Sequence, residues 1–215
     1  MLLNRQKRRS ELVKKCIPRS VKKIIDIGCA EGFTTNYLLD KDRFVVGIDL
    51  NFDNLRIAKQ NVKGVFYING SIDFLPFLDD YFDAATILEV LEHLPTELQI
   101  NGLHEANRVL KSQGALVISV PYKEQITYTK CIHCNEDTPL YGHLHTLDEN
   151  KISSLLPPKY SFQLKEKFNI PNMVYISCSN IFKGLPLSLW LKLNDLLGKT
   201  KLLRGYWIIL KYIKT

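Results

Sequence analysis

Residues 24–35 decide the fold of this chain, and they read Ile24-Ile25-Asp26-Ile27-Gly28-Cys29-Ala30-Glu31-Gly32-Phe33-Thr34-Thr35. A short apolar run ends after an acidic residue, and a turn bracketed by two glycines follows it. Gly28 permits a tight turn out of a strand, and Gly32 lets the next helix pack close to the sheet. The stretch therefore predicts a strand, a turn and a helix that together form a nucleotide-sized binding loop.

The glycine spacing limits the class of ligand that this loop can bind. A pyrophosphate-binding fingerprint reads G-x-G-x-x-G, and its second glycine lets the backbone approach a phosphate. Here Ala30 stands at the second position and Phe33 at the third. A ligand with an adenosine but no phosphate fits this loop better, and S-adenosylmethionine is the common one. The stretch resembles motif I of the class I S-adenosylmethionine-dependent methyltransferases, in which an acidic residue is followed by Gly and by a second Gly four residues on.

The composition is that of one globular domain. With 215 residues, of which 46% are hydrophobic and 24% charged, we expect a single methyltransferase domain over residues 1–215. The sequence has no run of about 18 apolar residues that could span a bilayer and no apolar signal core at its start, so we expect a cytoplasmic protein. Five cysteines are an odd number, which favours reduced thiols over a disulfide framework.

The net charge of +7 is concentrated at the two ends of the chain. Residues 1–23 hold nine Lys or Arg against one acid, and residues 192–215 hold six against one, so the stretch between them is acidic. Basic ends are typical of solvated terminal segments, or of a surface that contacts RNA, an anionic lipid surface or a phosphorylated substrate. An apolar helix expected over 185–197 could cover the substrate pocket, form a homodimer contact or rest on a membrane surface.

Strand and helix patterns alternate along most of the chain. Strands are expected at 23–27, 44–49, 64–69, 82–88, 114–120, 161–168 and 205–213, and helices at 5–17, 34–39, 54–60, 95–110, 148–156 and 185–197. Residues 122–148 interrupt the pattern as a Cys/His-containing insertion or lid. The alternation predicts a Rossmann-like, doubly wound α/β fold. The resemblance implies a mostly parallel seven-stranded sheet with an antiparallel edge strand.

Asp49 and three further stretches resemble the same family in order and spacing. Asp49 follows the first loop by about twenty residues, where the next strand presents a carboxylate to ribose hydroxyls. Residues 69–77 resemble the segment that lines the adenine, with Ser71 in place of the usual acid, so Ser71, Asp73 or backbone groups could read the exocyclic amine. Residues 82–89 and 109–116 resemble the fourth strand and the turn into the fifth. The expected cofactor site comprises Asp26, Gly28, Cys29, Ala30, Gly32, Asp49, Leu50, Gly70, Ser71, Ile72 and Glu89.

The chemistry needs few catalytic side chains, because a methyl group on a sulfonium is already activated. The enzyme aligns the nucleophile and excludes water, and a general base helps if the nucleophile is a hydroxyl. Glu89, Glu92 and His93 are spaced so that on a helical turn they point to one side, and we expect Glu92 and His93 to be catalytic. This face could also bind a divalent ion through oxygen and imidazole ligands.

The same turn resembles two groups of methyltransferases. In the ubiquinone-type O-methyltransferases and the small-RNA 3′-end 2′-O-methyltransferases, a Glu-x-x-Glu-His turn and a downstream histidine hold a metal. The resemblance implies that His143 or His145 is the downstream ligand here. The alternative is a metal-free turn in which the glutamates cap the helix and the histidine packs on the lid.

A second set of metal-ligating residues lies in the insertion. Cys131 and Cys134 form a Cys-x-x-Cys pair, and His143 and His145 follow within reach. Two thiolates and two imidazoles satisfy tetrahedral zinc, so we expect a structural zinc clip formed by these four residues, with His133 less favoured as a ligand. The alternative is a reduced, metal-free pair. The two metal sites compete for the same histidines, and they cannot both use His143.

The expected function is methyl transfer from S-adenosylmethionine to an oxygen of a small molecule, a lipid-linked intermediate or a sugar. An RNA 2′-O-methyltransferase is the alternative enzyme, supported by the Glu-x-x-Glu-His turn and the basic ends. A third possibility is a non-catalytic, cofactor-binding partner subunit that presents its zinc loop to another protein.

Overall fold

The computed structural model describes residues 2–157, 162–171 and 205–215, together with the single positions 186, 188, 189, 192, 193 and 196. Cys178 and most of the apolar helix expected over 185–197 lie outside these residues. Among the residues described, no helix is both long and apolar enough to cross a membrane.

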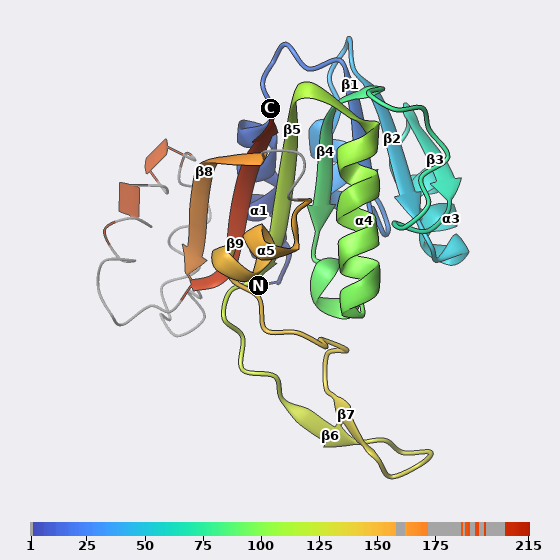
Figure 1. The fold of residues 1–215 in the computed structure, drawn as a ribbon, viewed down its shortest axis with the longest axis vertical. Coiled ribbons are helices and arrows are strands. Elements are labelled where there is room, and N and C mark those ends of the chain that lie inside the picture. Colours follow the sequence, from blue (N-terminus) through green and yellow to red (C-terminus); the bar gives the residue numbers. More distant parts are fainter. Residues whose placement is uncertain are drawn as a thin grey trace.

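A seven-stranded sheet forms the centre of the molecule, in the order β3-β2-β1-β4-β5-β9-β8 (Figure 1). Its strands are β1 (Lys23–Ile27), β2 (Phe44–Asp49), β3 (Val65–Asn69), β4 (Phe82–Leu88), β5 (Leu110–Pro121), β8 (Phe162–Pro171) and β9 (Gly205–Lys214). The first five run parallel, and β9 is antiparallel to both of its neighbours. The predicted doubly wound α/β fold is confirmed, and the antiparallel strand lies one position in from the edge strand β8.

Helices cover both faces of the sheet because its strands are apolar on both sides. Ile25 and Ile27 belong to the apolar cluster beneath α4 (Thr96–Val109) and α5 (Glu149–Leu155), whereas Ile24 belongs to the cluster on the opposite face. The second cluster includes residues of α1 (Leu2–Cys16) and α2 (Phe33–Leu38). Figure 1 shows α4 and α5 in front of the sheet and α1 behind it. The remaining helix, α3 (Phe52–Asn61), packs on β2 and β3.

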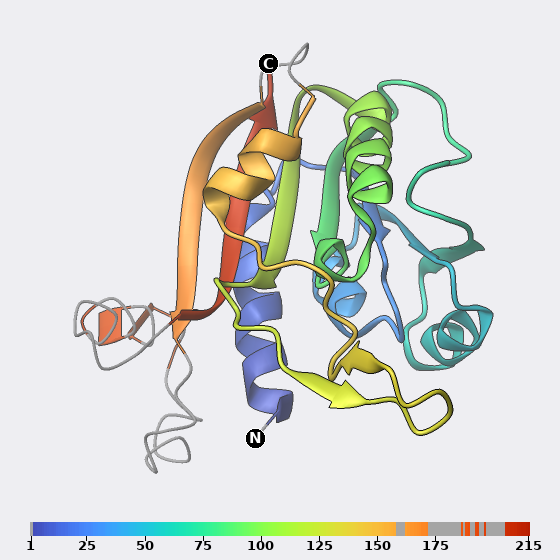
Figure 2. The ribbon, with the colours of Figure 1, turned by 60° about the horizontal axis from the view of Figure 1, so that its bottom comes forward.

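The insertion forms an arm, which we define as residues 122–146. It carries a small hairpin, β6 (Tyr128–Lys130) and β7 (Asp137–Pro139), which projects from the body beyond the carboxyl ends of the parallel strands (Figures 1 and 2). None of the arm's residues is buried. An isolated two-stranded hairpin is marginally stable in water. The position of the arm therefore depends on the contacts that its base makes with the body.

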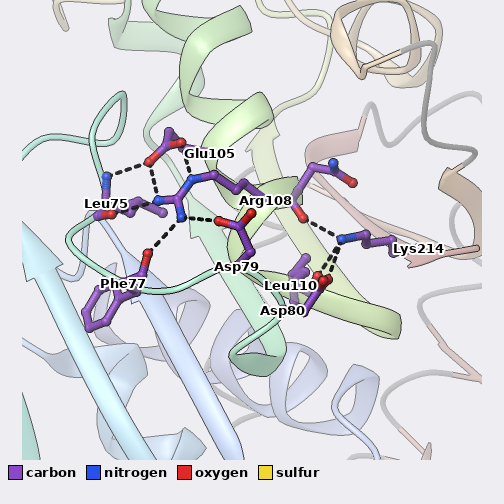
Figure 3. A network of polar contacts seen from close by, with 9 residues as sticks. Leu75, Phe77, Asp79, Asp80, Glu105, Arg108, Leu110 and Lys214 are labelled. Atoms are coloured by element: carbon purple, nitrogen blue, oxygen red, sulfur yellow. Dashed lines mark hydrogen bonds and ion pairs between the residues drawn. The ribbon is translucent and has the colours of Figure 1, made fainter.

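The loop between β3 and β4 is fixed by Arg108 of α4 (Figure 3). The guanidinium donates hydrogen bonds to the carbonyl oxygens of Leu75 (2.8 Å) and Phe77 (2.7 Å) and to the Asp79 carboxylate (2.7 Å). It also pairs with Glu105, whose pKa it holds below the usual range. Because this loop contains most of the predicted adenine-lining segment, residues 69–77, Arg108 supports one wall of the expected cofactor site.

We expect Arg108→Met to lower the free energy of unfolding by about 2 kcal/mol, because several charge-assisted hydrogen bonds are lost and Glu105 keeps an unpaired charge. Urea unfolding measures this change. The control is Arg56→Met, since Arg56 makes only an exposed ion pair with Asp53 at 3.5 Å and its loss is expected to change stability by less than about 0.5 kcal/mol. Equal effects of the two substitutions would contradict the role assigned to Arg108.

Candidate functional site

The site lies where the strand order reverses, between β1 and β4, at the carboxyl ends of the parallel strands. Gly28 has a φ of 75°, and a Cβ at this position would lie 2.3 Å from a methyl carbon of Val90. Only glycine fits there, so the first loop packs directly on the segment that follows β4. The backbone amides of Gly28 and Cys29 both donate to the carbonyl of Ile48, which ties the loop to β2.

The carboxylate of Asp49, at the end of β2, is available as a hydrogen-bond acceptor. One carboxylate oxygen accepts the amide of Ala30 at 2.8 Å, and the other accepts the amide of Asn51 at 2.9 Å. Each oxygen keeps a lone pair for a further donor. The side chain is half-buried, so a ligand can reach it. This arrangement matches the expected binding of two ribose hydroxyls.

Asp26 takes a different role from the expected ligand contact. It is buried, and its two carboxylate oxygens accept hydrogen bonds from the hydroxyls of Thr35 (2.5 Å) and Thr86 (2.6 Å). Burial raises the pKa of this carboxyl. Because Asp26 is buried and its carboxylate is bonded to both threonines, it joins β1 to α2 and β4 and supports the loop from within the protein.

The remaining cofactor candidates border the same end of the sheet. Ser71 is hydrogen-bonded to Asp73, so the two candidates for reading the adenine amine form one unit. Leu50 is 75% exposed and offers an apolar surface beside Asp49, whereas Ile72 and Cys29 are buried. The amide of Gly70 donates to the Asp49 carbonyl at 3.1 Å, and Gly32 has a φ of 80° just before α2.

The Glu-x-x-Glu-His segment does not form the expected helical turn. Glu89 has a φ of 58°, and the helical part of the segment is limited to Leu91–His93, which form the short 3₁₀ helix η1. The expectation that Glu89, Glu92 and His93 share one helical face was therefore wrong. Glu89 has a left-handed backbone conformation and lies between the end of β4 and the start of η1. Glu89 instead accepts the Ser119 hydroxyl at 2.5 Å and pairs with Arg9 at 3.3 Å.

Glu92 is the most unusual residue of the site. Glu92 is 1% exposed, and neither of its carboxylate oxygens has a hydrogen-bond partner among the residues that the structure describes. Burial, and next the nearby Glu89 carboxylate, raise the pKa of Glu92 to about 9. A buried polar group without a partner is costly for the folded state. The unpartnered carboxyl of Glu92 therefore indicates a binding site for a ligand that would pair with it.

The base of the arm brings a histidine to Glu92. The amide of Leu144 donates to the Glu92 carbonyl at 2.7 Å, and the His93 ring nitrogen Nδ1 lies 3.1 Å from the Gly142 carbonyl. The rings of His93 and His143 meet edge to face with their centroids 4.7 Å apart. One potential ligand atom from each of Glu92, His93 and His143 lies within 4.8 Å of the others.

The zinc clip is not assembled within the described residues. The loop at the tip of the hairpin carries Cys131 and Cys134, whereas His143 lies at the base of the arm beside His93 and is paired with Glu124. Neither cysteine, nor His145, joins a group of three metal-ligating residues in the part of the chain that the structure describes. A site formed by Cys131, Cys134, His143 and His145 therefore remains a prediction, and in this structure the thiols lie in the hairpin loop while His143 lies beside His93.

Three site residues were missed in the sequence. Arg9 pairs with Glu89 and lies over the ring of Trp207 at 4.9 Å, and Ser119 and Glu124 contact Glu89 and His143. Arg9 precedes the buried Leu12 by three residues on α1, so helical periodicity could have identified it. Ser119 and Glu124 carry no comparable signal.

The fold and the site together indicate which class of protein the chain resembles. A parallel sheet with a glycine turn after β1 and an acid at the end of β2 is the arrangement by which doubly wound α/β folds bind nucleosides. Residues 25–118, from β1 to β5, match the family described as "Methyltransferase domain". The match to a methyltransferase domain thus covers the strands that carry the predicted cofactor site.

Individual relatives agree with this assignment. A probable S-adenosylmethionine-dependent methyltransferase of Mycolicibacterium smegmatis is 28% identical over 146 residues, which cover 67% of this chain and 52% of the relative. A ubiquinone biosynthesis O-methyltransferase of Glaesserella parasuis is 34% identical over 107 residues, covering 46% and 44%. The chain thus spans about half the length of these curated relatives. A crystal structure of a Pyrococcus horikoshii protein has the same fold, with a TM-score of 0.69 at 18% identity, covering 98% of this chain and 90% of that one.

Proposed function

We propose that the chain transfers the methyl group of S-adenosylmethionine to a hydroxyl oxygen of a small acceptor, with a divalent metal ion held by Glu92, His93 and His143. One observation carries the proposal: a buried carboxylate without a hydrogen-bond partner converges with two imidazoles beside the cofactor loop. The similarity to a ubiquinone biosynthesis O-methyltransferase supports oxygen as the acceptor atom.

The residues fit both groups that the proposal requires. An oxygen and two nitrogen donors suit Zn²⁺, Mn²⁺, Fe²⁺ and related ions. The positive charge of a metal ion would pair with the carboxylate oxygens of Glu92, which have no hydrogen-bond partner among the described residues. Metal binding therefore explains why a carboxyl is buried here. For S-adenosylmethionine, the acceptor positions of Asp49 and the apolar surface of Leu50 suit the ribose and the adenine.

When bound, S-adenosylmethionine would supply an activated methyl group and leave as S-adenosylhomocysteine, and a metal ion held by Glu92, His93 and His143 would lower the pKa of the acceptor hydroxyl, whose proton passes to solvent. The protein orients the reactants and excludes water. Glu92 without metal is protonated at neutral pH, since its pKa is raised to about 9, so it does not act there as a general base. Its role is that of a ligand. Arg9 and Ser119 hold the carboxylate of Glu89, which lies close enough to Glu92 to raise its pKa.

An RNA 2′-O-methyltransferase is the second candidate, and the basic helix α1 is the feature that favours it. Part of that charge is used within the protein, since Arg8 pairs with Glu11 at 2.8 Å and Arg9 with Glu89 at 3.3 Å. The observations therefore favour a small acceptor, such as a phenol or sugar with hydroxyls on adjacent carbons.

A transfer assay with tritiated S-adenosylmethionine tests the proposal. Small phenols and sugars with adjacent hydroxyls are compared with an RNA oligonucleotide that carries a free 3′-terminal ribose. Label in a small acceptor supports the proposal, and label only in the oligonucleotide selects the RNA enzyme. Tight binding of S-adenosylmethionine without transfer to either kind of acceptor would contradict both and favour a non-catalytic partner subunit.

Removal of metal gives a further prediction. We expect chelation followed by gel filtration to lower the transfer rate at least about 100-fold, since metal ions contribute several kcal/mol to such reactions. Added Mn²⁺, Co²⁺ or Zn²⁺ restores the rate. Binding of S-adenosylmethionine, followed by calorimetry as the control, stays unchanged, because Asp49 lies outside the metal group. A chelated enzyme that keeps its full rate would rule out the metal.

A further inference from the structure

We propose that Glu124 is a positioning residue that fixes the tautomer and orientation of His143 as a metal ligand. This inference deepens the proposed function and rests on the metal site within it. Glu124 is hydrogen-bonded to Nδ1 of His143. A carboxylate only accepts, so Nδ1 carries the proton and Nε2 keeps its lone pair for a metal. A histidine ligand held by a carboxylate on its other nitrogen is a recurrent arrangement at metal sites.

The hydrogen bond between Glu124 and His143 joins the two legs of the arm, which are the segment that leads to the hairpin and the segment that returns from it. Glu124 lies on the outgoing leg and His143 on the returning leg, and the legs also meet through a bridge between Tyr122 and Leu147. The Thr146 hydroxyl donates to the Glu124 carbonyl at 2.8 Å, so the backbone on both sides of the pair is held. Both side chains are largely covered, at 24% and 15% exposed for Glu124 and His143.

His143 needs such support more than the other two ligands. Glu92 and His93 belong to η1, which is anchored in the body directly after β4, and Glu92 is itself buried. The arm has no buried residue, so no apolar core fixes its ring. The rings of His93 and Tyr141 contact the His143 ring, and the carboxylate of Glu124 is its hydrogen-bond partner. Loss of the Glu124 acceptor would leave the ring free to rotate or to change tautomer.

The test is metal binding to the full chain, measured with Co²⁺ by calorimetry and by the visible absorption of the bound ion. We expect Glu124→Ala to weaken Co²⁺ binding about 10- to 100-fold. Glu124→Gln restores most of the affinity, because the amide oxygen still accepts from Nδ1. The matched control is Glu136→Ala, which removes the same charge from an exposed position on the arm and leaves Co²⁺ binding unchanged.

The outcomes separate the two proposals. If the wild type binds Co²⁺ and Glu124→Ala binds it equally well, the positioning role is overturned while the metal site stands. Equal loss in the Ala and Gln variants would also overturn it, since the hydrogen bond would then not be the cause. If the wild type binds no Co²⁺, the metal part of the proposed function fails, and this inference fails with it. Unchanged binding of S-adenosylmethionine in every variant shows that the domain is folded.

Discussion

Replacing Asp49 by alanine is expected to weaken the binding of S-adenosylmethionine by about 100-fold or more. The carboxylate is held by the amides of Ala30 and Asn51, and each of its oxygens keeps a lone pair for a ribose hydroxyl. Two hydrogen bonds to a charged acceptor contribute together about 3 kcal/mol, which is roughly 100-fold in affinity. Isothermal titration calorimetry measures the change.

The control for Asp49 is Asp53→Ala. Asp53 carries the same charge in the first turn of α3, where its carboxylate makes only an exposed ion pair with Arg56 at 3.5 Å. We expect this variant to bind S-adenosylmethionine as the wild type does. Equal affinities for the wild type and Asp49→Ala would show that the cofactor does not bind at the end of β2.

Glu92→Gln is expected to have opposite effects on stability and on metal binding. In the metal-free protein the pKa of Glu92 is raised from 4.5 to about 9. Between these values the folded protein keeps a proton that the unfolded chain has lost, so the free energy of unfolding falls as the pH rises, by up to about 1.4 kcal/mol per pH unit. Glutamine does not titrate, so the variant loses this slope and is more stable above about pH 5. It also loses the anionic ligand, and Co²⁺ binding falls below detection.

Denaturant unfolding at several pH values, in the presence of a chelator, measures the slope. Glu105→Gln is the contrasting control, because Arg108 lowers the pKa of Glu105 and its replacement is expected to reduce stability at neutral pH. A wild-type protein whose stability does not fall between pH 5 and 8, relative to Glu92→Gln, would contradict the assignment of a buried, unpartnered carboxyl.

The fold was predictable because its signals are local. The apolar runs that predict β1, β2 and β4 coincide with the observed bounds Lys23–Ile27, Phe44–Asp49 and Phe82–Leu88. The layers and the mostly parallel sheet then follow from the alternation of strands and helices. Asp49 was predicted as a ribose acceptor for the same reason, since its place at the end of a strand is set by the sequence around it.

The metal group was only partly predictable, because long-range contacts decide it. Short spacing placed His143 in a clip with Cys131 and Cys134, yet the hairpin carries the thiols to its tip and leaves His143 at its base. The left-handed conformation of Glu89 removed it from the helical face it was expected to share. Glu124 has no sequence signal, since only the folded arm places it against the histidine.

The most direct test of the account is a reaction with S-adenosylmethionine carrying a ¹³C-labelled methyl group, followed by NMR of the acceptor. The account predicts a methyl resonance at the chemical shift of a methyl ether, formed by the metal-loaded wild type and not by the chelated protein or by Glu92→Gln. A methyl resonance on nitrogen or carbon, or an ether that forms equally well in the chelated protein, would contradict metal-dependent methyl transfer to oxygen.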